Sequence, residues 1–280
     1  MQPRNLREAL EGELNEKELG ELGRSFDIVG DIAILKIPDS LSSKKRVIGE
    51  ALMNVHHNLK TVLRQTSPVR GEYRTRDLEV IAGKPTTITE HRESDCTFKV
   101  DLAKTYFSPR LAHERMRIAK KVESGEVVTN MFAGVGCYSV IIARHANSSK
   151  VYSIDKNPDA VEFMRHNIRV NKVGETVVPI EGDAREIIDS QLKERANRVL
   201  MPLPELGRDF LDVALRALKP EGGIIHFYDF GEEPNPFKSS LKFVQEAVSP
   251  KKVELLESRK VRSYAPNLYH VVLDLHIAKS

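Results

Sequence analysis

A glycine-spaced turn follows an apolar run in the segment NMFAGVGCYSV, residues 130–140. Gly134 and Gly136 stand where a chain leaving a strand can bring its backbone close to a nucleotide-like ligand. A dinucleotide fingerprint needs a further glycine three residues on, and this chain has Ser139 there. The turn alone therefore leaves open a dinucleotide or another nucleotide-like ligand.

Acidic residues stand at the ends of the next two predicted strands. The segment KVYSIDKN contains Asp155, and VVPIEGD ends in Asp183. A carboxylate at the first position can accept hydrogen bonds from ribose hydroxyls, and one at the second can accept a hydrogen bond from an adenine amine. Either acid alone could equally be a helix N-cap. Together with the short glycine turn, they favour S-adenosylmethionine over a nicotinamide dinucleotide.

Strands and helices alternate in the second part of the chain, which predicts a doubly wound parallel sheet with an antiparallel end. Predicted helices cover 111–122, 137–146, 158–173, 206–218 and 236–248. Predicted strands cover 126–134, 150–157, 176–183, 196–204, 222–230, 251–264 and 268–279. We therefore expect an α/β catalytic domain over residues 101–280.

The first part of the chain has a different pattern. Residues 1–23 and 44–59 have helical periodicity, and 26–37 reads as a hairpin that turns at Gly30. Strands are predicted at 61–65, 86–94 and 96–103, with a polar connection at 67–83. These elements predict a small α+β domain over residues 1–100, and the boundary rests on the change of pattern alone.

Composition excludes several classes of protein. The chain has 280 residues, of which 40% are hydrophobic, and no run approaches the roughly 18 apolar residues of a membrane-spanning helix. The charged start is not a signal peptide. Two cysteines, without a CxxC pair, predict neither a disulfide framework nor a structural zinc site. His113 and His226 are interpreted as packing or hydrogen-bonding residues, so no metal is expected. We expect a cytoplasmic protein.

A basic stretch lies within the first predicted domain. From Lys60 to Arg76 there are five basic residues and one acid, Glu72. Such a stretch is either a solvated face or a surface that follows the phosphates of a nucleic acid.

The motifs MFAGVG, IDKNPDAVEFMRHNIRVNKV, GDARE, RVLMPLP and RSYAP resemble those of the archaeal tRNA (guanine-37-N1)-methyltransferases. Upstream, RGEYRTRD and YFSPRLAHER are similar to motifs of the same family. The resemblance runs from about residue 60 to the C-terminus and keeps the motif order. It implies a class I methyltransferase fold, a Rossmann-like sheet of seven strands whose last strand is antiparallel. It also implies a tRNA partner bound at its anticodon loop by the small domain.

The resemblance assigns roles to residues at the matching positions. Glu114 corresponds to the base that removes the N1 proton of guanine, and Arg74 to the cation facing O6. Tyr106 and Arg110 match positions that help to order the site. The remaining matches are Pro202 and Pro204 near the target base, and Phe132, Ala133, Gly134, Gly136, Asp155, Lys156, Asp183 and Ala184 around S-adenosylmethionine. By itself Glu114 could instead be a helix-face partner of Arg117 or Arg110.

Three departures and two rival functions qualify this resemblance. Pro202 stands where the family often has asparagine, and Asn130 ends the first strand where an acid is common. We also expect the family's extra N-terminal domain to be absent. One rival is the wybutosine-pathway aminocarboxypropyltransferase, whose SPxN segment is not matched by SPRL here. The other is a non-catalytic RNA-binding module. Methylation of a tricyclic wyosine precursor is also open. A monomer is expected, because one chain holds all these residues.

Overall fold

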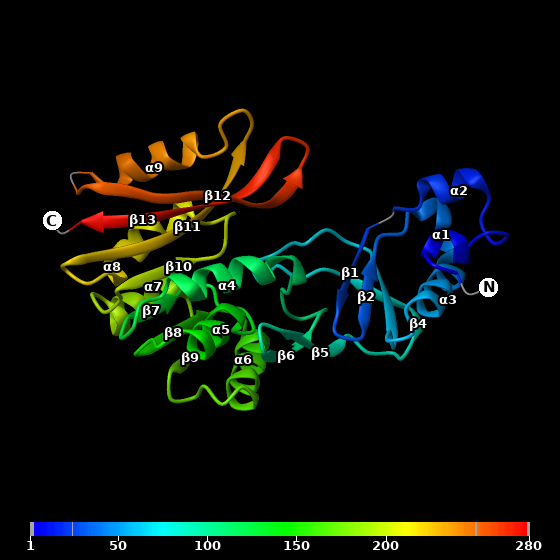
Figure 1. Cartoon of the computed structure of the whole chain (residues 1–280), viewed down its shortest axis with the longest axis horizontal. Coiled ribbons are helices and arrows are strands. Elements are labelled where there is room, and N and C mark those ends of the chain that lie inside the picture. Colours follow the sequence, from blue (N-terminus) through cyan, green and yellow to red (C-terminus); the bar gives the residue numbers. More distant parts are fainter. Residues whose placement is uncertain (1–2, 24, 250, 279–280) are drawn as a thin grey trace. The chain divides into compact units, whose positions relative to one another are not determined.

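The computed structural model describes residues 3–23, 25–249 and 251–278, and it divides into two compact units, Met1–Pro109 and Arg110–Ser280 (Figure 1). Residues 1–2 of the predicted helical segment 1–23 and residue 279 of the predicted last strand lie outside the described residues. The first unit extends beyond residue 100 because the following segment bonds back to it. Leu102 N–H donates to Thr87 O, and Thr105 N–H donates to Asp101 O, both at 2.9 Å. Tyr106 therefore belongs to the first unit.

The first unit contains a four-stranded sheet of order β1-β2-β3-β4. Its elements are α1 (Leu6–Ala9), α2 (Glu16–Glu21), β1 (Phe26–Val29), β2 (Ile32–Leu35), α3 (Lys45–Val55), β3 (Thr61–Gln65) and β4 (Leu78–Gly83). Strands β1 and β2 form the predicted hairpin, and β2 pairs in parallel with β3. Helix α3 connects these two strands and buries Ile48 and Leu52 in the core of this unit.

Strand β4 corrects the prediction of a polar connection over 67–83. It pairs antiparallel with β3 at the edge of the sheet. Ile81 is its only buried side chain, and Val80 is exposed. The apolar alternation of a half-buried strand is therefore weak here, which is why the pattern did not reveal it.

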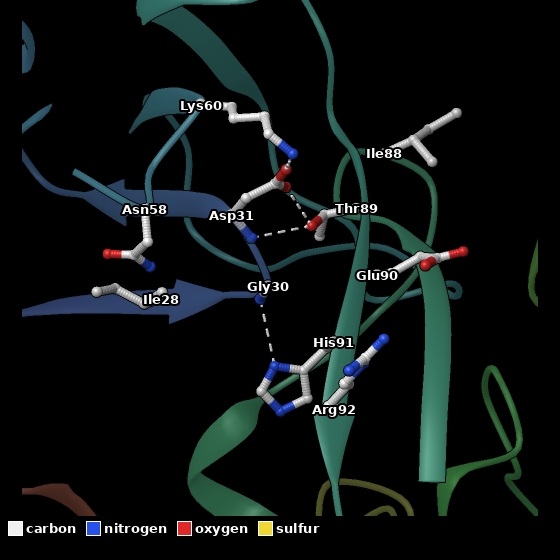
Figure 2. A pocket seen from close by; sticks show the side chains of 10 residues that line it. All are labelled: Ile28, Gly30, Asp31, Asn58, Lys60, Ile88, Thr89, Glu90, His91 and Arg92. Carbon is white, nitrogen blue, oxygen red and sulfur yellow. Dashed lines mark hydrogen bonds and ion pairs between the residues drawn. The ribbon is translucent and has the colours of Figure 1, made fainter. Parts of the chain in front are cut away.

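A second hairpin, β5 (Ile88–Glu93) and β6 (Cys96–Asp101), is fastened to the turn between β1 and β2 (Figure 2). Gly30 N–H donates to His91 Nδ1 at 3.3 Å, and Asp31 N–H donates to Thr89 Oγ1 at 3.2 Å. The Asp31 carboxylate accepts from Thr89 at 2.6 Å and pairs with Lys60 at 2.8 Å. These residues line part of a hollow of ≈ 730 Å³.

The second unit is built on a seven-stranded sheet of order β12-β13-β11-β10-β7-β8-β9. The strands are β7 (Val127–Asn130), β8 (Lys150–Asp155), β9 (Val177–Glu181), β10 (Arg198–Met201), β11 (Gly222–Glu232), β12 (Val253–Ala265) and β13 (Leu268–Ala278). Strand β13 pairs antiparallel with both neighbours, while the central strands pair in parallel. The predicted fold class, with an antiparallel last strand, is confirmed.

Helices cover both faces of this sheet (Figure 1). They are α4 (Ala112–Lys121), α5 (Cys137–His145), α6 (Pro158–Val170), α7 (Ala184–Ile187), α8 (Leu211–Ala217) and α9 (Lys238–Val248). The strand order runs one way from β7 to β9 and then the other way through β10 and β11. Because such crossovers are right-handed, this reversal places α5 and α6 on one face and α8 and α9 on the other. Ligands bind at the carboxyl ends of the strands beside the point where the order reverses, which here lies between β7 and β10.

Local sequence explains where the central elements begin and end. All four side chains of β10 are buried, as expected for a parallel strand covered on both faces. Helix α6 begins at Pro158, after Asn157 has capped it by accepting from Asp159 N–H. Helix α7 was not predicted, because it has four residues and continues into an irregular turn at Ile188–Leu192.

Candidate cofactor and catalytic site

The glycine turn after β7 is held by backbone hydrogen bonds. Ala133 N–H donates to Ile154 O at 2.8 Å, and Gly136 N–H donates to Ala133 O at 2.9 Å. Gly134 and Gly136 have φ values of 55° and 89°, in the left-handed region that favours glycine. Two glycines are therefore required by the backbone path, and helix α5 begins directly after them.

Replacing Gly136 with alanine is expected to lower the free energy of unfolding by about 1–3 kcal/mol, the cost of a strained backbone conformation. A Cβ atom there would also lie 2.8 Å from Met164 Cγ. Urea unfolding measures the loss. Gly174→Ala is the control, because its nearest neighbour, Ile168 Cγ2, lies at 3.8 Å. Equal losses in both variants would contradict the argument from backbone strain.

Asp155, at the end of β8, ties the glycine turn to the start of the next helix. Its Oδ2 accepts from Gly134 N–H at 2.6 Å, and its Oδ1 accepts from Asn157 N–H at 2.9 Å. The carboxylate is partly buried. Burial raises the pKa of Asp155, although the two backbone donors act in the opposite direction. Each oxygen retains a lone pair, so this carboxylate could also accept from two ribose hydroxyls.

Asp183, at the end of the next strand segment, is the N-cap of α7. Its carboxylate accepts from Arg185 N–H at 2.9 Å and lies 3.4 Å from Lys156 Nζ. Ala184 is buried in the helix behind it. The N-cap that was predicted as the alternative for this acid is therefore present. The second carboxylate oxygen of Asp183 can still accept a hydrogen bond. The predicted bond from the adenine amine to Asp183 therefore remains a prediction.

Phe132 supplies an aromatic surface beside the glycine turn. Its ring makes an edge contact with Phe210, with the ring centroids 5.0 Å apart. The Arg185 guanidinium lies over the other ring of this pair, 3.6 Å from the Phe210 centroid. Phe132 is partly buried, so part of the ring faces solvent.

The residues at this edge of the sheet fit S-adenosylmethionine. Gly134 and Gly136 allow close approach of a ligand to the backbone, and Asp155 offers acceptors for ribose hydroxyls. Asn130, buried at the end of β7, donates to Ser139 Oγ at 3.1 Å. Its Oδ1 has no hydrogen-bond partner among the described residues. A buried acceptor of this kind suits the ammonium of a methionine moiety.

Pro202 and Pro204 follow β10 at the same edge of the sheet. Pro202 is half-buried and Pro204 is buried. Between them, Leu203 N–H donates to Met201 O at 2.7 Å, which closes a tight turn. Neither proline has a side-chain or backbone donor, so the position that often carries asparagine presents an apolar ring here.

The Glu114 carboxylate lies in a buried network on α4. It is 4% exposed and accepts from Arg117 Nε at 2.9 Å and Arg117 Nη2 at 2.7 Å. Tyr228 OH donates to its Oε1 at 2.7 Å, and Tyr138 OH donates to Tyr228 at 3.3 Å. Burial raises the pKa of both tyrosines, so both remain neutral donors. The helix-face pair with Arg117 that was considered from the sequence is present.

The bonds to Glu114 leave one acceptor position. A carboxylate has about four lone-pair sites. Two sites on Oε1 and one on Oε2 are used by Arg117 and Tyr228 within the described part of the chain. The fourth site, on Oε2, can accept a hydrogen bond or a proton from a substrate group.

The network continues from Arg117 into the sheet. Arg117 donates to Asp274 at 2.6 Å and 3.2 Å, and His226 Nδ1 lies 2.6 Å from Asp274 Oδ1. His226 Nε2 lies 2.9 Å from Arg198 Nη1, and Arg198 pairs with Glu126. A guanidinium can only donate, so Nε2 accepts and the proton of His226 is on Nδ1, directed at Asp274. His226 is thus a hydrogen-bonding residue.

Arg74 and Tyr106 lie together within the first unit. The Arg74 guanidinium carbon is 4.7 Å from the centre of the Tyr106 ring. Arg74 has a φ of 54°, and its N–H donates to Gly71 O at 3.1 Å. The structure thus brings these two motif residues into contact, while their roles remain predictions. Arg110 opens the second unit with an exposed side chain, in a 3₁₀ turn at Pro109–Leu111.

The basic stretch from Lys60 to Arg76 is not a uniform cationic face. Arg64 is 8% exposed and binds Ile37 O and the Asp39 carboxylate, so it is a structural residue. Lys60 and Arg70 are paired with Asp31 and Asp77. The charge available to a nucleic acid is therefore smaller than the sequence count indicated.

Sequence reasoning missed several residues of the Glu114 network, among them Tyr228 and Asp274. Both lie in largely buried strands, β11 and β13. A polar side chain inside such a run is a signal that could have found them, because buried polar groups are paired.

The strand order, the glycine turn and the acid at the end of β8 define a class I methyltransferase. Models of two protein families match: the TRM5/TYW2 methyltransferase domain over residues 89–256 and the TYW2 N-terminal domain over residues 6–86. The chain belongs to the TRM5/TYW2 family. The predicted family and its class, S-adenosylmethionine-dependent methyltransferases, are confirmed.

Three curated relatives illustrate the range of this family. Trm5b of Pyrococcus abyssi, a tRNA (guanine(37)-N(1))-methyltransferase, is 44% identical over 92% of this chain and 76% of its own length. The tRNA(Phe) (4-demethylwyosine(37)-C(7)) aminocarboxypropyltransferase of Methanocaldococcus jannaschii is 33% identical over 90% and 98%. The tRNA 4-demethylwyosine(37)-methyltransferase Taw21 of Saccharolobus solfataricus is 34% identical over 91% and 94%.

Solved structures agree with this membership. The complex of aTrm5 and tRNALeu is 39% identical, with a TM-score of 0.88, and covers 99% of this chain and 79% of that one. TYW2 of M. jannaschii in complex with AdoMet is 28% identical, with a TM-score of 0.71, and covers 91% and 100%. Within the described residues of this chain, no helix is long and apolar enough to span a membrane.

Proposed function

We propose that this protein transfers the methyl group of S-adenosylmethionine to N1 of guanine 37 in tRNA. The observation that carries the proposal is the Glu114 carboxylate, held by Arg117 and Tyr228 with one acceptor position left on Oε2. The activity of Trm5b from P. abyssi, 44% identical to this chain, supports the same acceptor. The partner is then tRNA, recognised at its anticodon loop, and the enzyme acts as a cytoplasmic monomer.

The acceptor chemistry assigns a task to each named residue. When bound, S-adenosylmethionine supplies an electrophilic methyl group on a sulfonium. Guanine N1 carries a proton at neutral pH and is a poor nucleophile until that proton leaves, so Glu114 accepts it. Charge moves onto O6 as N1 attacks, and Arg74 stabilises it. Tyr106 supports the Arg74 guanidinium through its ring face, and Arg110 orders the acceptor.

A transfer assay tests the proposal directly. The substrate is a tRNA transcript with guanine at position 37, and the donor is labelled either on the methyl group or on the carboxyl carbon. We expect methyl label on the tRNA and none after guanine 37 is replaced. Carboxyl label would move the protein to the aminocarboxypropyl branch, and no label with S-adenosylmethionine bound would indicate a non-catalytic RNA-binding module.

A second candidate is methylation of a tricyclic wyosine precursor, and Pro202 is the observation that favours it. Its half-buried ring offers an apolar surface and no donor to the edge of a guanine. Taw21 of S. solfataricus, 34% identical, acts on 4-demethylwyosine. Methyl label on tRNA that already carries this precursor, compared with unmodified tRNA, separates the two acceptors.

Replacing Asp155 with asparagine is expected to weaken S-adenosylmethionine binding by about 10- to 100-fold, the worth of charged hydrogen bonds to ribose. Protonation has the same effect, since the ionised carboxylate is the acceptor. Burial raises the pKa of Asp155, so affinity falls as pH decreases and begins to fall above the range of an ordinary aspartate. Calorimetric titration with S-adenosylmethionine and NAD at several pH values measures the loss of affinity in Asp155→Asn and its dependence on pH.

The control for Asp155 is Asp95→Asn, which removes an exposed carboxylate in the first unit. Its donor affinity and pH dependence are expected to match those of the unaltered protein. Unchanged affinity in Asp155→Asn would remove Asp155 from the donor site, and tighter binding of NAD would favour the dinucleotide that the glycine turn alone left open.

A further inference from the structure

Arg117 bridges two buried carboxylates. On one side it holds Glu114 with two hydrogen bonds of 2.7 and 2.9 Å. On the other it holds Asp274 with bonds of 2.6 and 3.2 Å. Glu114 and Asp274 are 4% and 1% exposed. One guanidinium thus links the proposed base on α4 to an acid on β13.

Asp274 keeps its negative charge in this arrangement. Burial alone would raise the pKa of Asp274, but hydrogen bonds from His226 and Arg117 outweigh it and lower the pKa well below the usual range. Burial, together with the nearby cations Arg198 and Arg117, lowers the pKa of His226, so the ring is neutral. Arg117 therefore always has a charged partner other than Glu114.

That second partner matters when Glu114 takes up a proton. The N1–H bond of guanine breaks, its proton goes to Glu114 Oε2, and the electron pair on N1 forms the new bond to the methyl carbon as the carbon–sulfur bond breaks. Glu114 then becomes neutral. A buried guanidinium left without a carboxylate costs several kcal/mol. Asp274 removes that cost, because it stays paired with Arg117 throughout.

We infer that Arg117 and Asp274 are positioning residues for the proton transfer: Arg117 holds the Glu114 carboxylate with two hydrogen bonds, and Asp274 keeps the guanidinium paired when that carboxylate becomes neutral. The inference rests on the proposed function. Other ionisable groups around the network are Lys121 on α4, Tyr138 on α5, Tyr228 on β11 and Glu257 on β12, and Arg115 on α4 acts electrostatically on Tyr138. Glu257 is 40% exposed, so solvent screens its effect.

The two residues predict pH shifts of opposite sign. Single-turnover methylation is measured across pH with saturating S-adenosylmethionine and tRNA. In Asp274→Asn, Glu114 becomes the main charge partner of Arg117 and protonates less readily. The acid limb of the pH–rate profile then moves to lower pH by roughly one pH unit. The plateau rate falls about 10-fold because the base is weaker. In Arg117→Met the limb moves up by about 1–3 pH units.

Matched variants guard against a merely structural effect. Glu257→Gln, which removes an exposed carboxylate 3.3 Å from the same guanidinium, is expected to shift the limb downward by less than Asp274→Asn. If Arg117→Met does not fold, Arg117→Lys replaces it, and its limb moves up by less because the charge remains. S-adenosylmethionine affinity in each variant reports whether the donor site is intact.

Failure of the inference can be told apart from failure of the proposed function. If the Glu114→Gln variant methylates tRNA at the normal rate, Glu114 is not the base and the proposed function loses its mechanism. If that variant is inactive, but Asp274→Asn and Arg117→Met shift the limb in the same direction or not at all, the inference is overturned. Opposite shifts support it.

Discussion

Glu114→Gln is expected to lower the single-turnover rate of methyl transfer by about 10²- to 10⁴-fold, the usual contribution of a general base. Glutamine keeps the shape of the side chain but cannot accept the N1 proton. Arg117 remains paired with Asp274 in the variant, so no buried cation is left unpaired. Rapid-quench measurements with labelled S-adenosylmethionine and guanine-37 tRNA give the rate, and calorimetry gives the donor affinity.

The separation of rate from binding decides the role of Glu114. Donor affinity is expected to stay within about twofold, because the residue acts on the acceptor proton and not on the donor. Glu162→Gln, an exposed change of the same kind on α6, is the control and should leave both quantities unchanged. Equal losses of donor affinity and rate would assign Glu114 a structural role, as the ion-pair partner of Arg117.

Arg74→Ala tests the second residue to which the proposed function assigns a task in the acceptor chemistry. Removing one preorganised donor to a developing oxyanion typically costs about 10²- to 10³-fold in rate. In this chain the guanidinium rests on the Tyr106 ring, so Tyr106→Leu would weaken its placement without removing its charge. The two substitutions thus distinguish the charge from its support.

Much of the second unit was predictable from the sequence, because its strands are short apolar runs separated by clear helix starts. Pro158 after Asn157, for example, marks the beginning of α6. Gly134, Gly136 and Asp155 could be placed together, since parallel strands end at one edge of a sheet. The first unit was harder: β4 lies at an edge, and Ile81 is its only buried side chain.

The network around Glu114 could not be predicted in the same way. Tyr228 and Asp274 lie more than a hundred residues along the chain from Glu114 and Arg117, which form an i,i+3 pair on α4. Their contact depends on the register of β13 against β11, where His226 lies opposite Asp274. A one-residue change of register would turn these side chains to the other face of the sheet. Sequence patterns do not fix such a register.

Arg198→Met is expected to lower the free energy of unfolding by about 3–5 kcal/mol, the cost of breaking a buried ion pair from one side. Arg198 is 2% exposed and donates to Glu126 at 2.6 and 2.9 Å, to Lys121 O at 2.7 Å and to His226 Nε2. Urea unfolding followed by circular dichroism measures the loss. Arg216→Met is the control, because its pair with Asp189 is exposed and worth about 1 kcal/mol or less.

A second substitution shows where that cost arises. Methionine replaces the volume of Arg198 but leaves Glu126 charged and His226 Nε2 without its donor. If the uncompensated charge dominates, adding Glu126→Gln to Arg198→Met recovers about half of the lost stability or more. If the second substitution recovers nothing, the loss comes from the His226 and Lys121 carbonyl bonds instead. In that case the hydrogen bonds that Arg198 donates stabilise the protein more than its charge does.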